Sequence, residues 1–333
     1  MTIPAIVTAG EGVASKTVYG DNKAYLELGG LPLVARVVQA LQRVPEVSEV
    51  WLVGNAQRLG ELFERPEVQA EIVKPLHIVP QFRNLYENAW QTFRRLLPDA
   101  GLDGRDPVGD EIDQPVLYLS ADLPFATPQE ISEFVRRSAE LEADYAVGLV
   151  PEESLADFMP STAGEAGIQV AFFNLREGRF RQSNLHYAKP ARIGNRKYIE
   201  DMYEHRYQQE FGHIARLAWT ILKSQRGGLR ILFLYLAIHL AGIANRHGLR
   251  GLADRLRHLV SSAAVEHSIS SLLDTNYRFV VTEVGGCGID IDNEAEFDAA
   301  RARFEDWSAA QAARAHELYG APALPTGPVR ERS

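Results

Sequence analysis

The chain has 333 residues, of which 46% are hydrophobic and 24% charged, and its formal net charge is -9. This is the composition of a globular protein large enough to hold a closed site. The acidic balance argues against a nucleic-acid binder, because such binding depends largely on Lys and Arg contacts to phosphate. A single cysteine, Cys287, excludes an intramolecular disulfide and a cysteine-based zinc cluster; we interpret it as a small buried residue.

Over residues 1–150, short apolar runs alternate with segments of helical period. The predicted strands are 6–7, 50–54, 76–79, 116–120 and 145–150, and the helices between them include 33–41, 85–97 and 129–141. This alternation predicts an α/β fold with a mostly parallel, Rossmann-like sheet and helices on both of its faces. Residues 99–113, rich in Gly, Asp and Pro, are predicted to form a surface loop.

The rest of the chain departs from a compact version of that fold. A strand is predicted at 170–173, a polar, basic segment at 176–196, a long helical insertion at 197–271 and a further strand at 277–281. Within the insertion, 229–244 is almost wholly apolar but too short to span a bilayer comfortably. We favour a buried helix or an oligomer interface there over a membrane-surface helix.

We therefore divide the chain into four parts. Residues 1–150 are predicted to form a nucleotide-binding core, 151–276 an acceptor-binding segment with the helical insertion, 277–320 a return to the core, and 321–333 a disordered tail. No basic segment followed by an apolar one opens the chain, which predicts a cytoplasmic location.

The loop after the first strand carries the first chemical signal. It contains Ala9-Gly10-Glu11-Gly12, then Lys16, and ends in Gly20-Asp21-Asn22-Lys23. Glycines allow the backbone to approach an anion closely, and a lysine supplies a point charge. These features predict a phosphate site, although an ordinary strand-to-helix loop is the alternative.

This order resembles the molybdenum-cofactor-guanylyltransferase-like NTP transferases, whose signature is an Ala-Gly-Gly loop, an Arg-Met-Gly turn and a Lys two residues further on. The resemblance implies a nucleotide-diphospho-sugar transferase type of fold and a loop that wraps a triphosphate, here Ala9, Gly10, Glu11, Gly12 and Lys23. Three differences stand out. Glu11 replaces a loop glycine and would repel phosphate unless a metal or lysine offsets it; the loop is longer; and the customary arginine is missing, with Lys16 as its candidate substitute.

Asp122 follows the predicted strand 116–120 in the sequence Ser-Ala-Asp-Leu-Pro. Ligands bind at this edge of open parallel sheets, and Mg²⁺ prefers one or two carboxylates together with phosphate and water. The resemblance implies that Asp122 binds the metal and that Ala121 contacts the nucleotide. A capping role is the alternative, but Thr127 supplies a separate helix start.

Asp290 and Asp292 lie in a segment that resembles the closing motif of the same family. Alternation along an extended segment points both carboxylates to one side. Either both carboxylates bind one divalent ion, or one binds the metal and the other caps the following helix. We assign Asp290 to the metal and Asp292 mainly to the cap, while keeping both as metal candidates; solvated turn residues are the alternative.

The turn at 81–90 is where the resembled family binds base and ribose. Asn84 is a plausible helix cap with Glu87 three residues on, so Asn88 is the better candidate for a nucleotide contact. The base cannot be read from this turn.

Arg181, Asn184 and Lys189, in the basic segment, are the candidates for binding an acceptor phosphate. An exposed basic loop is the alternative.

Together these elements predict an Mg²⁺-dependent nucleotidyltransferase that releases pyrophosphate from an NTP, with Lys16 and Lys23 as catalytic cations and a phosphorylated small molecule as acceptor. An amphiphilic acceptor would accompany membrane contact, which we do not favour. The alternatives are a metal-dependent glycosyltransferase of the same architecture and a degenerate nucleotide-binding regulatory protein. Neither the acceptor nor the oligomeric state can be read from the sequence.

Overall fold

The computed structural model describes residues 2–11, 17–160, 162, 165–205, 240, 251, 255 and 258–323. Its strands are β1 (Ile3–Ala9), β2 (Thr17–Val18), β3 (Asp21–Asn22), β4 (Glu27–Leu28), β5 (Leu31–Pro32), β6 (Val47–Gly54), β7 (Leu76–Pro80), β8 (Val116–Ser120), β9 (Tyr145–Pro151), β10 (Phe173–Leu175), β11 (Gly178–Ala188) and β12 (Tyr277–Val281). Its α-helices are α1 (Leu33–Gln42), α2 (Ala56–Phe63), α3 (Pro66–Gln69), α4 (Leu85–Leu96), α5 (Pro128–Glu140), α6 (Arg196–His205), α10 (Ser262–Leu273), α11 (Glu294–Ala302) and α12 (Phe304–Tyr319).

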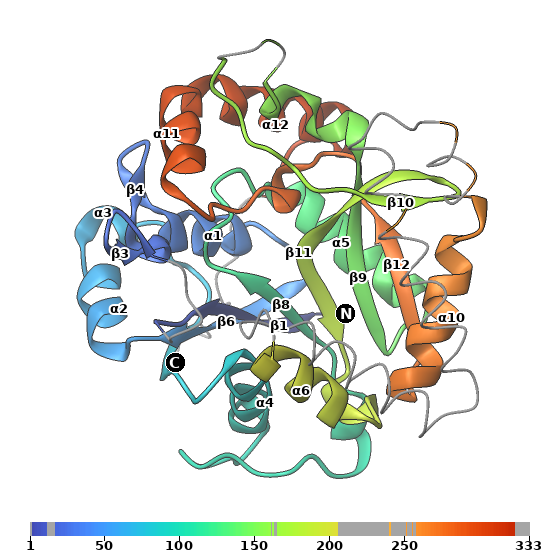
Figure 1. Cartoon of the computed structure of the whole chain (residues 1–333). Coiled ribbons are helices and arrows are strands. Elements are labelled where there is room, and N and C mark those ends of the chain that lie inside the picture. The colour runs from blue at the N-terminus through green and yellow to red at the C-terminus, as the bar shows by residue number, and fades with distance from the viewer. Residues whose placement is uncertain are drawn as a thin grey trace.

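One sheet organises the molecule, with the strand order β12-β9-β11-β8-β1-β6-β7 and β10 paired to β11 (Figure 1). The pairs β1–β6, β1–β8, β6–β7 and β9–β12 are parallel, whereas β11 is antiparallel to both β8 and β9. The carboxyl ends of all these strands except β11 therefore point toward one edge, because β10 is antiparallel to β11 and so runs in the direction of β8 and β9. The predicted mostly parallel α/β sheet is confirmed.

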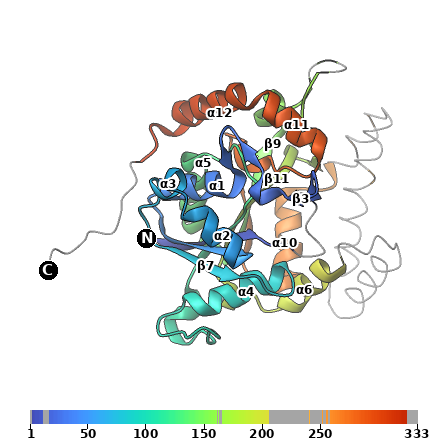
Figure 2. The ribbon, with the colours of Figure 1, turned by 90° about the vertical axis from the view of Figure 1, so that its left-hand side faces the viewer.

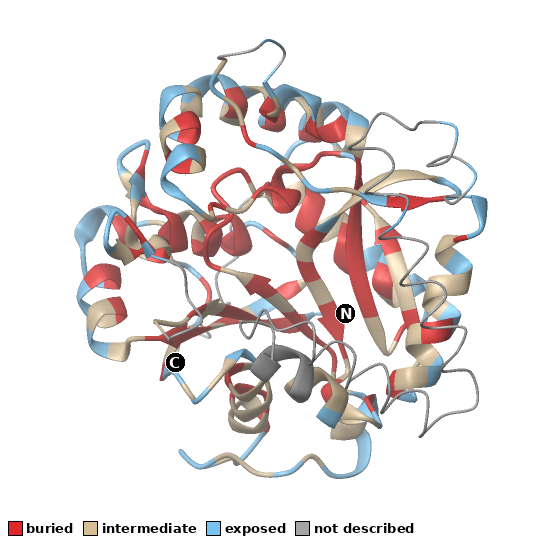
Figure 3. Cartoon of the chain, in the orientation of Figure 1, coloured by how far each residue is buried: buried red, intermediate tan, exposed pale blue. Residues whose placement is uncertain are grey.

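Helices cover both faces of this sheet, as Figure 2 shows, with α1 and α5 on one side and α4 and α6 on the other. Val37, Leu41 and Phe134 pack with Val7 and Leu117 in the core under α1 and α5. A second core under α4 is formed by Ile6, Val53, Val79, Phe93, Leu97 and Val116. Figure 3 shows the resulting buried band along the central strands. Apolar runs buried on both faces are what a parallel sheet requires.

The polar, basic segment 176–196, for which the sequence predicted no strand, contains one. Residues 178–188 form β11, which is inserted between β8 and β9. The strand predicted at 170–173 begins only at Phe173 and forms a hairpin with β11. The sheet thus continues across the boundary placed at residue 150, and the division of the chain into functional parts stays a prediction.

Of the predicted helical insertion 197–271, the structure describes α6 and α10 at its two ends and a few residues between them. Arg83 of the α4 turn pairs with Glu200 of α6 at 2.5 Å, and the Arg196 guanidinium lies 3.9 Å from the centre of the Trp90 ring. Glu266 of α10 accepts a hydrogen bond from the backbone N–H of Phe279 on β12 at 2.8 Å. Both helices therefore pack on the side of the sheet that α4 covers.

Two sequence predictions lie largely or wholly outside the described residues: the apolar segment 229–244, apart from Leu240, and the tail beyond residue 323. Within the described part of the chain, no helix has the length and apolar character needed to cross a membrane.

The approach of Gly286 to the segment after β8 sets a strict limit on side-chain size. A Cβ at this position would lie 1.8 Å from the backbone oxygen of Phe125, which cannot move independently of its chain. We expect Gly286→Ala to lower the free energy of unfolding by about 2 kcal/mol or more.

Gly60 is the matched control, because it lies inside α2 with nothing within 4 Å of an added Cβ. Gly60→Ala is expected to stabilise the protein by about 0.5–1 kcal/mol. Urea unfolding of both variants measures the difference; equal stability of the two would contradict the close approach.

Candidate functional site

The backbone of the loop after β1 is held by the side chains of Asn22 and Gln81. The Gly10 carbonyl accepts a hydrogen bond from Asn22 Nδ2 at 2.9 Å, and the Glu11 backbone N–H donates to Gln81 Oε1 at 2.6 Å. A Cβ at Gly10 would lie 3.3 Å from Asn88 Nδ2 and 3.5 Å from Gln81 Oε1. The loop backbone is therefore close to the turn that starts α4. Gly12 and Lys16 lie outside the described residues.

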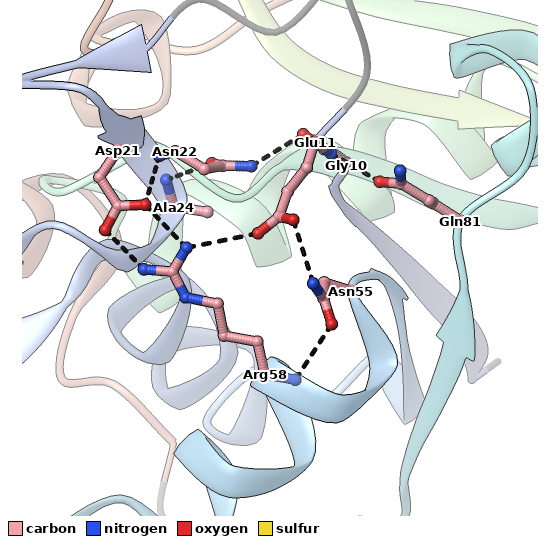
Figure 4. Close-up of polar contacts among 8 residues, drawn as sticks. All are labelled: Gly10, Glu11, Asp21, Asn22, Ala24, Asn55, Arg58 and Gln81. Carbon is pink, nitrogen blue, oxygen red and sulfur yellow. Dashed lines mark hydrogen bonds and ion pairs between the residues drawn. The ribbon is translucent and has the colours of Figure 1, made fainter.

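The Glu11 carboxylate is directed toward α2, as Figure 4 shows. Its Oε2 accepts from Asn55 Nδ2 at 3.1 Å, and its Oε1 lies 3.4 Å from Arg58 Nη1. Arg58 also donates to both carboxylate oxygens of Asp21, at 2.7 and 2.5 Å, and stacks 3.7 Å from the centre of the Tyr25 ring. An arginine, rather than the metal or lysine considered from the sequence, thus faces Glu11.

The three predicted metal ligands come together beyond the end of β8. One oxygen each from Asp122, Asp290 and Asp292 lies within 4.8 Å of the others. Asp122 is only 3% exposed. Its side chain accepts a hydrogen bond from Ser120 Oγ, and its backbone oxygen accepts one from the Ile291 N–H at 3.3 Å. This last contact joins the segment after β8 to the one after β12.

Lys23 lies between two of these carboxylates. Its Nζ is 2.5 Å from Asp122 Oδ2 and 2.7 Å from Asp292 Oδ1. It opens a short 3-10 helix, Lys23–Tyr25, whose cap is the Asn22 side chain accepting from the Ala24 N–H at 2.9 Å. Burial alone lowers the pKa of Lys23, but the two carboxylates outweigh it and hold that pKa well above its ordinary value. The ammonium therefore stays charged at neutral pH.

The Asp292 assignment needs a correction. The N-cap of α11 is Asn293, whose side chain accepts from the Glu296 N–H at 3.0 Å. Asp292 instead contacts Lys23 and donates its backbone N–H to Glu296 Oε2 at 2.8 Å. Alternation places Asp292 on the side of Asp290, so its carboxylate faces the cluster while the next residue caps the helix.

Two predicted nucleotide contacts lie next to this cluster and the loop. Asn88 is buried, its Oδ1 accepts from the Phe82 N–H at 2.6 Å, and its Nδ2 faces Gly10. Ala121 is buried and donates its backbone N–H to Thr8 at 3.2 Å. The predicted caps at Asn84 and Thr127 are confirmed as the N-caps of α4 and α5, so Asp122 is not a cap.

The three predicted acceptor residues lie at different points along β11 and just after it, so they are at different distances from the carboxylate cluster. Arg181 pairs in register with Val150 near the end of β9, and its Nη2 lies 2.9 Å from Asp290 Oδ1. Asn184 is partly buried in the same strand, one residue before the Leu185–Leu119 pair.

Lys189 does not reach the site. The preceding Ala188 pairs with Val116 and Tyr145, the first residues of β8 and β9, and Lys189 Nζ lies 3.2 Å from Asp144. Because β11 is antiparallel to its neighbours, its carboxyl end is at the edge opposite Asp122. The predicted acceptor role of Lys189 does not fit this position.

Comparison with known proteins agrees with this geometry. Residues 5–155 match the family model described as the MobA-like NTP transferase domain. Two relatives are named 2-C-methyl-D-erythritol 4-phosphate cytidylyltransferase. The one from Chlorobium luteolum is 26% identical over 138 residues, which are 41% of this chain and 55% of that protein. The one from Halalkalibacterium halodurans is 29% identical over 169 residues, 51% of this chain and 63% of that protein.

The chain thus spans less than two thirds of the length of the curated relatives it matches. A solved structure described as a hypothetical transferase from Thermus thermophilus superimposes with a TM-score of 0.56 at 23% identity, covering 89% of this chain and 99% of that one. The resemblance to the NTP transferases is confirmed, as is the fold. The molybdenum-cofactor guanylyltransferases are not singled out within that family.

Arg58 offers a first test of the loop. Arg58→Gln leaves Glu11 and Asp21 without their guanidinium beside the glycine loop, so we expect an NTP to bind about tenfold more weakly by calorimetry. Arg65→Gln is the control, because Arg65 pairs with the exposed Glu27 at 3.3 Å. Equal NTP affinity in the two variants would contradict the role given to Arg58.

Proposed function

We propose that this chain, whose residues 5–155 match the MobA-like NTP transferase domain, transfers a nucleotidyl group from an NTP to a phosphorylated small molecule and releases pyrophosphate. The observation that carries the proposal is the placement of Lys23. Lys23 directly follows Asn22, whose side chain binds the Gly10 carbonyl in the glycine loop. Its ammonium contacts Asp122 and Asp292, which come from two distant segments of the chain. A triphosphate on the loop would thus meet a charged lysine and a candidate metal site.

The residues present fit Mg²⁺. Three carboxylates offer hard oxygen ligands within 4.8 Å of one another, and Mg²⁺ is usually bound by one or two carboxylates together with substrate phosphates. Burial raises the pKa of Asp122, and the charge of Asp290 adds to this rise while Lys23 opposes it. Asp122, Asp290 and Asp292 would hold the ion, which supplies Lewis-acid stabilisation of phosphate charge when bound.

The chain's own residues perform the positioning. In the proposed reaction an acceptor phosphate oxygen attacks the α-phosphorus in line; a new P–O bond forms there as the bond to the bridging oxygen of pyrophosphate breaks. Asn22 and Gln81 hold the loop backbone on which the triphosphate would lie. Lys23 would neutralise charge that builds on the departing pyrophosphate, so catalysis is mainly orientation and electrostatic stabilisation.

Arg181 is the proposed acceptor contact. Its guanidinium is at the same sheet edge as Asp122, partly exposed and already oriented by Asp290. A planar guanidinium binds phosphate oxygens in pairs, which suits an acceptor that must present one oxygen for attack.

A pyrophosphate-release assay tests the function. The purified chain is incubated with Mg²⁺, each of the four NTPs and a panel of phosphorylated metabolites. CTP is tried first because the matched relatives are named cytidylyltransferases. Acceptor-dependent pyrophosphate release supports the proposal. Release of a nucleoside diphosphate from a nucleotide-sugar would support the glycosyltransferase alternative, and nucleotide binding without turnover the regulatory one.

Asp122→Asn should reduce turnover strongly. The substitution keeps the size of a buried side chain but removes the charge that a divalent ion requires, so we expect kcat to fall by about 10²–10³-fold with folding preserved. Circular dichroism checks the fold beside the assay. A folded variant with wild-type pyrophosphate release would remove Asp122 from the metal site.

Lys23→Met should raise KM for the NTP and lower kcat together, because the same ammonium binds the ground state and stabilises the leaving group. A loss of about 100-fold in kcat/KM is expected. Lys197→Met, at an exposed position of α6, is the control for loss of one positive charge. Matching kinetics for the two variants would refute the role of Lys23.

A further inference from the structure

Glu130 is a fully buried carboxylate that the proposed reaction does not use. It is 0% exposed and lies in the first turn of α5, a helix that begins soon after Asp122. In the sequence Glu130 looks like an ordinary charged residue at the start of a helix. A buried charge needs partners, so its surroundings show what it does.

Within the part of the chain that the structure describes, the hydrogen bonds to the Glu130 carboxylate come from one short segment, 282–287. Oε1 accepts from Thr282 Oγ1 at 2.9 Å and from the Gly285 N–H at 3.2 Å, and Oε2 accepts from the Cys287 N–H at 3.0 Å. All three partners are donors, which matches an ionised carboxylate that can only accept. Its position near the amino end of α5 adds the favourable field of the helix.

This segment leads directly to two of the three candidate metal ligands. Residues 282–287 run from the end of β12 into Asp290 and Asp292, while Glu130 follows Asp122 through the start of α5. The two segments also meet where the Ile291 N–H donates to the Asp122 backbone oxygen at 3.3 Å, and where Gly286 packs on Phe125. Glu130 connects the two segments through its side-chain hydrogen bonds.

We propose that Glu130 is a positioning residue that sets the separation of Asp122 from Asp290 and Asp292, and so the affinity of this site for a divalent cation. This inference rests on the metal site of the proposed function. Residues behind metal ligands typically change metal affinity by 10–100-fold when altered. A residue with a purely structural role would instead lower stability without a matching change in metal binding.

Two substitutions separate these roles. Glu130→Gln presents an amide NH₂ to backbone donors and removes the charge. Thr282→Val keeps the shape of the side chain and removes one donor. Ser138→Ala is the matched control, because Ser138 is equally buried on α5 and its hydroxyl donates to the Phe134 carbonyl at 2.7 Å, away from the carboxylates.

The experiment measures Mn²⁺ binding to each purified full-length variant by electron paramagnetic resonance, together with the melting temperature. We expect the Mn²⁺ dissociation constant to rise at least tenfold in Glu130→Gln and about threefold in Thr282→Val. Ser138→Ala should lower the melting temperature and leave Mn²⁺ binding unchanged.

Wild-type Mn²⁺ affinity in a folded Glu130→Gln protein would overturn the proposal. If that variant fails to fold, unchanged affinity in Thr282→Val overturns it equally, and so would a wild-type protein that binds no Mn²⁺. A wild-type protein that binds Mn²⁺ but releases no pyrophosphate would contradict the proposed function alone, because the dependence of Mn²⁺ affinity on Glu130 is measured without turnover.

Discussion

Repulsion among three carboxylates at one sheet edge is the constraint on which the site depends. Asp122, Asp290 and Asp292 lie within 4.8 Å of one another, and Asp122 is almost completely buried. Like charges this close stay together only when cations and backbone ties outweigh their repulsion. Lys23 and Arg181 supply the cations, each at 2.9 Å or less from its carboxylates. Without the fold that places these two side chains here, the three carboxylates would not stay this close together.

The topology of the sheet, more than any single motif, brings these side chains to one edge. Asp122 follows β8, and the segment that carries Asp290 and Asp292 follows β12, which is paired in parallel with β9 at the edge of the sheet. Between β8 and β9 lies the antiparallel β11, which brings Arg181 to the same edge from the opposite direction. The site is therefore assembled from chain segments that contribute to one sheet.

Sequence patterns predicted what depends on local physics. The strands of the main sheet within residues 1–150 were predictable, because parallel strands buried on both faces are short apolar runs. The caps at Asn84 and Thr127 were predictable because a side-chain oxygen must serve the first N–H groups of a helix. The short antiparallel pairs β2–β3 and β4–β5 were not predicted. Strand β11 was missed because it carries arginines and polar residues. The acceptor role predicted for Lys189 failed for the same reason. Because β11 was not predicted, its antiparallel direction was unknown, and so was the sheet edge at which Lys189 lies.

Contacts between residues that are distant in the chain leave no pattern in the sequence, so they could not be predicted. Arg58 and Glu11 meet only because β1 and β6 are neighbours with Ala9 opposite Gly54. Glu130 in turn looks like a surface residue of a helix start until β12 is placed beside α5.

The segment 21–23 shows how the site can accommodate a longer loop than is usual in the NTP transferases that the chain resembles. Each of its residues has a different partner: Asp21 binds Arg58, Asn22 binds the Gly10 carbonyl, and Lys23 binds two carboxylates. Residues 21–23, at the end of the loop, are therefore fixed by contacts of their own, whatever the number of residues before them. Because loop closure costs little extra entropy per added residue, insertion before a segment fixed in this way leaves the lysine in place. The positive charge of Lys23 therefore stays beside Asp122 and Asp292.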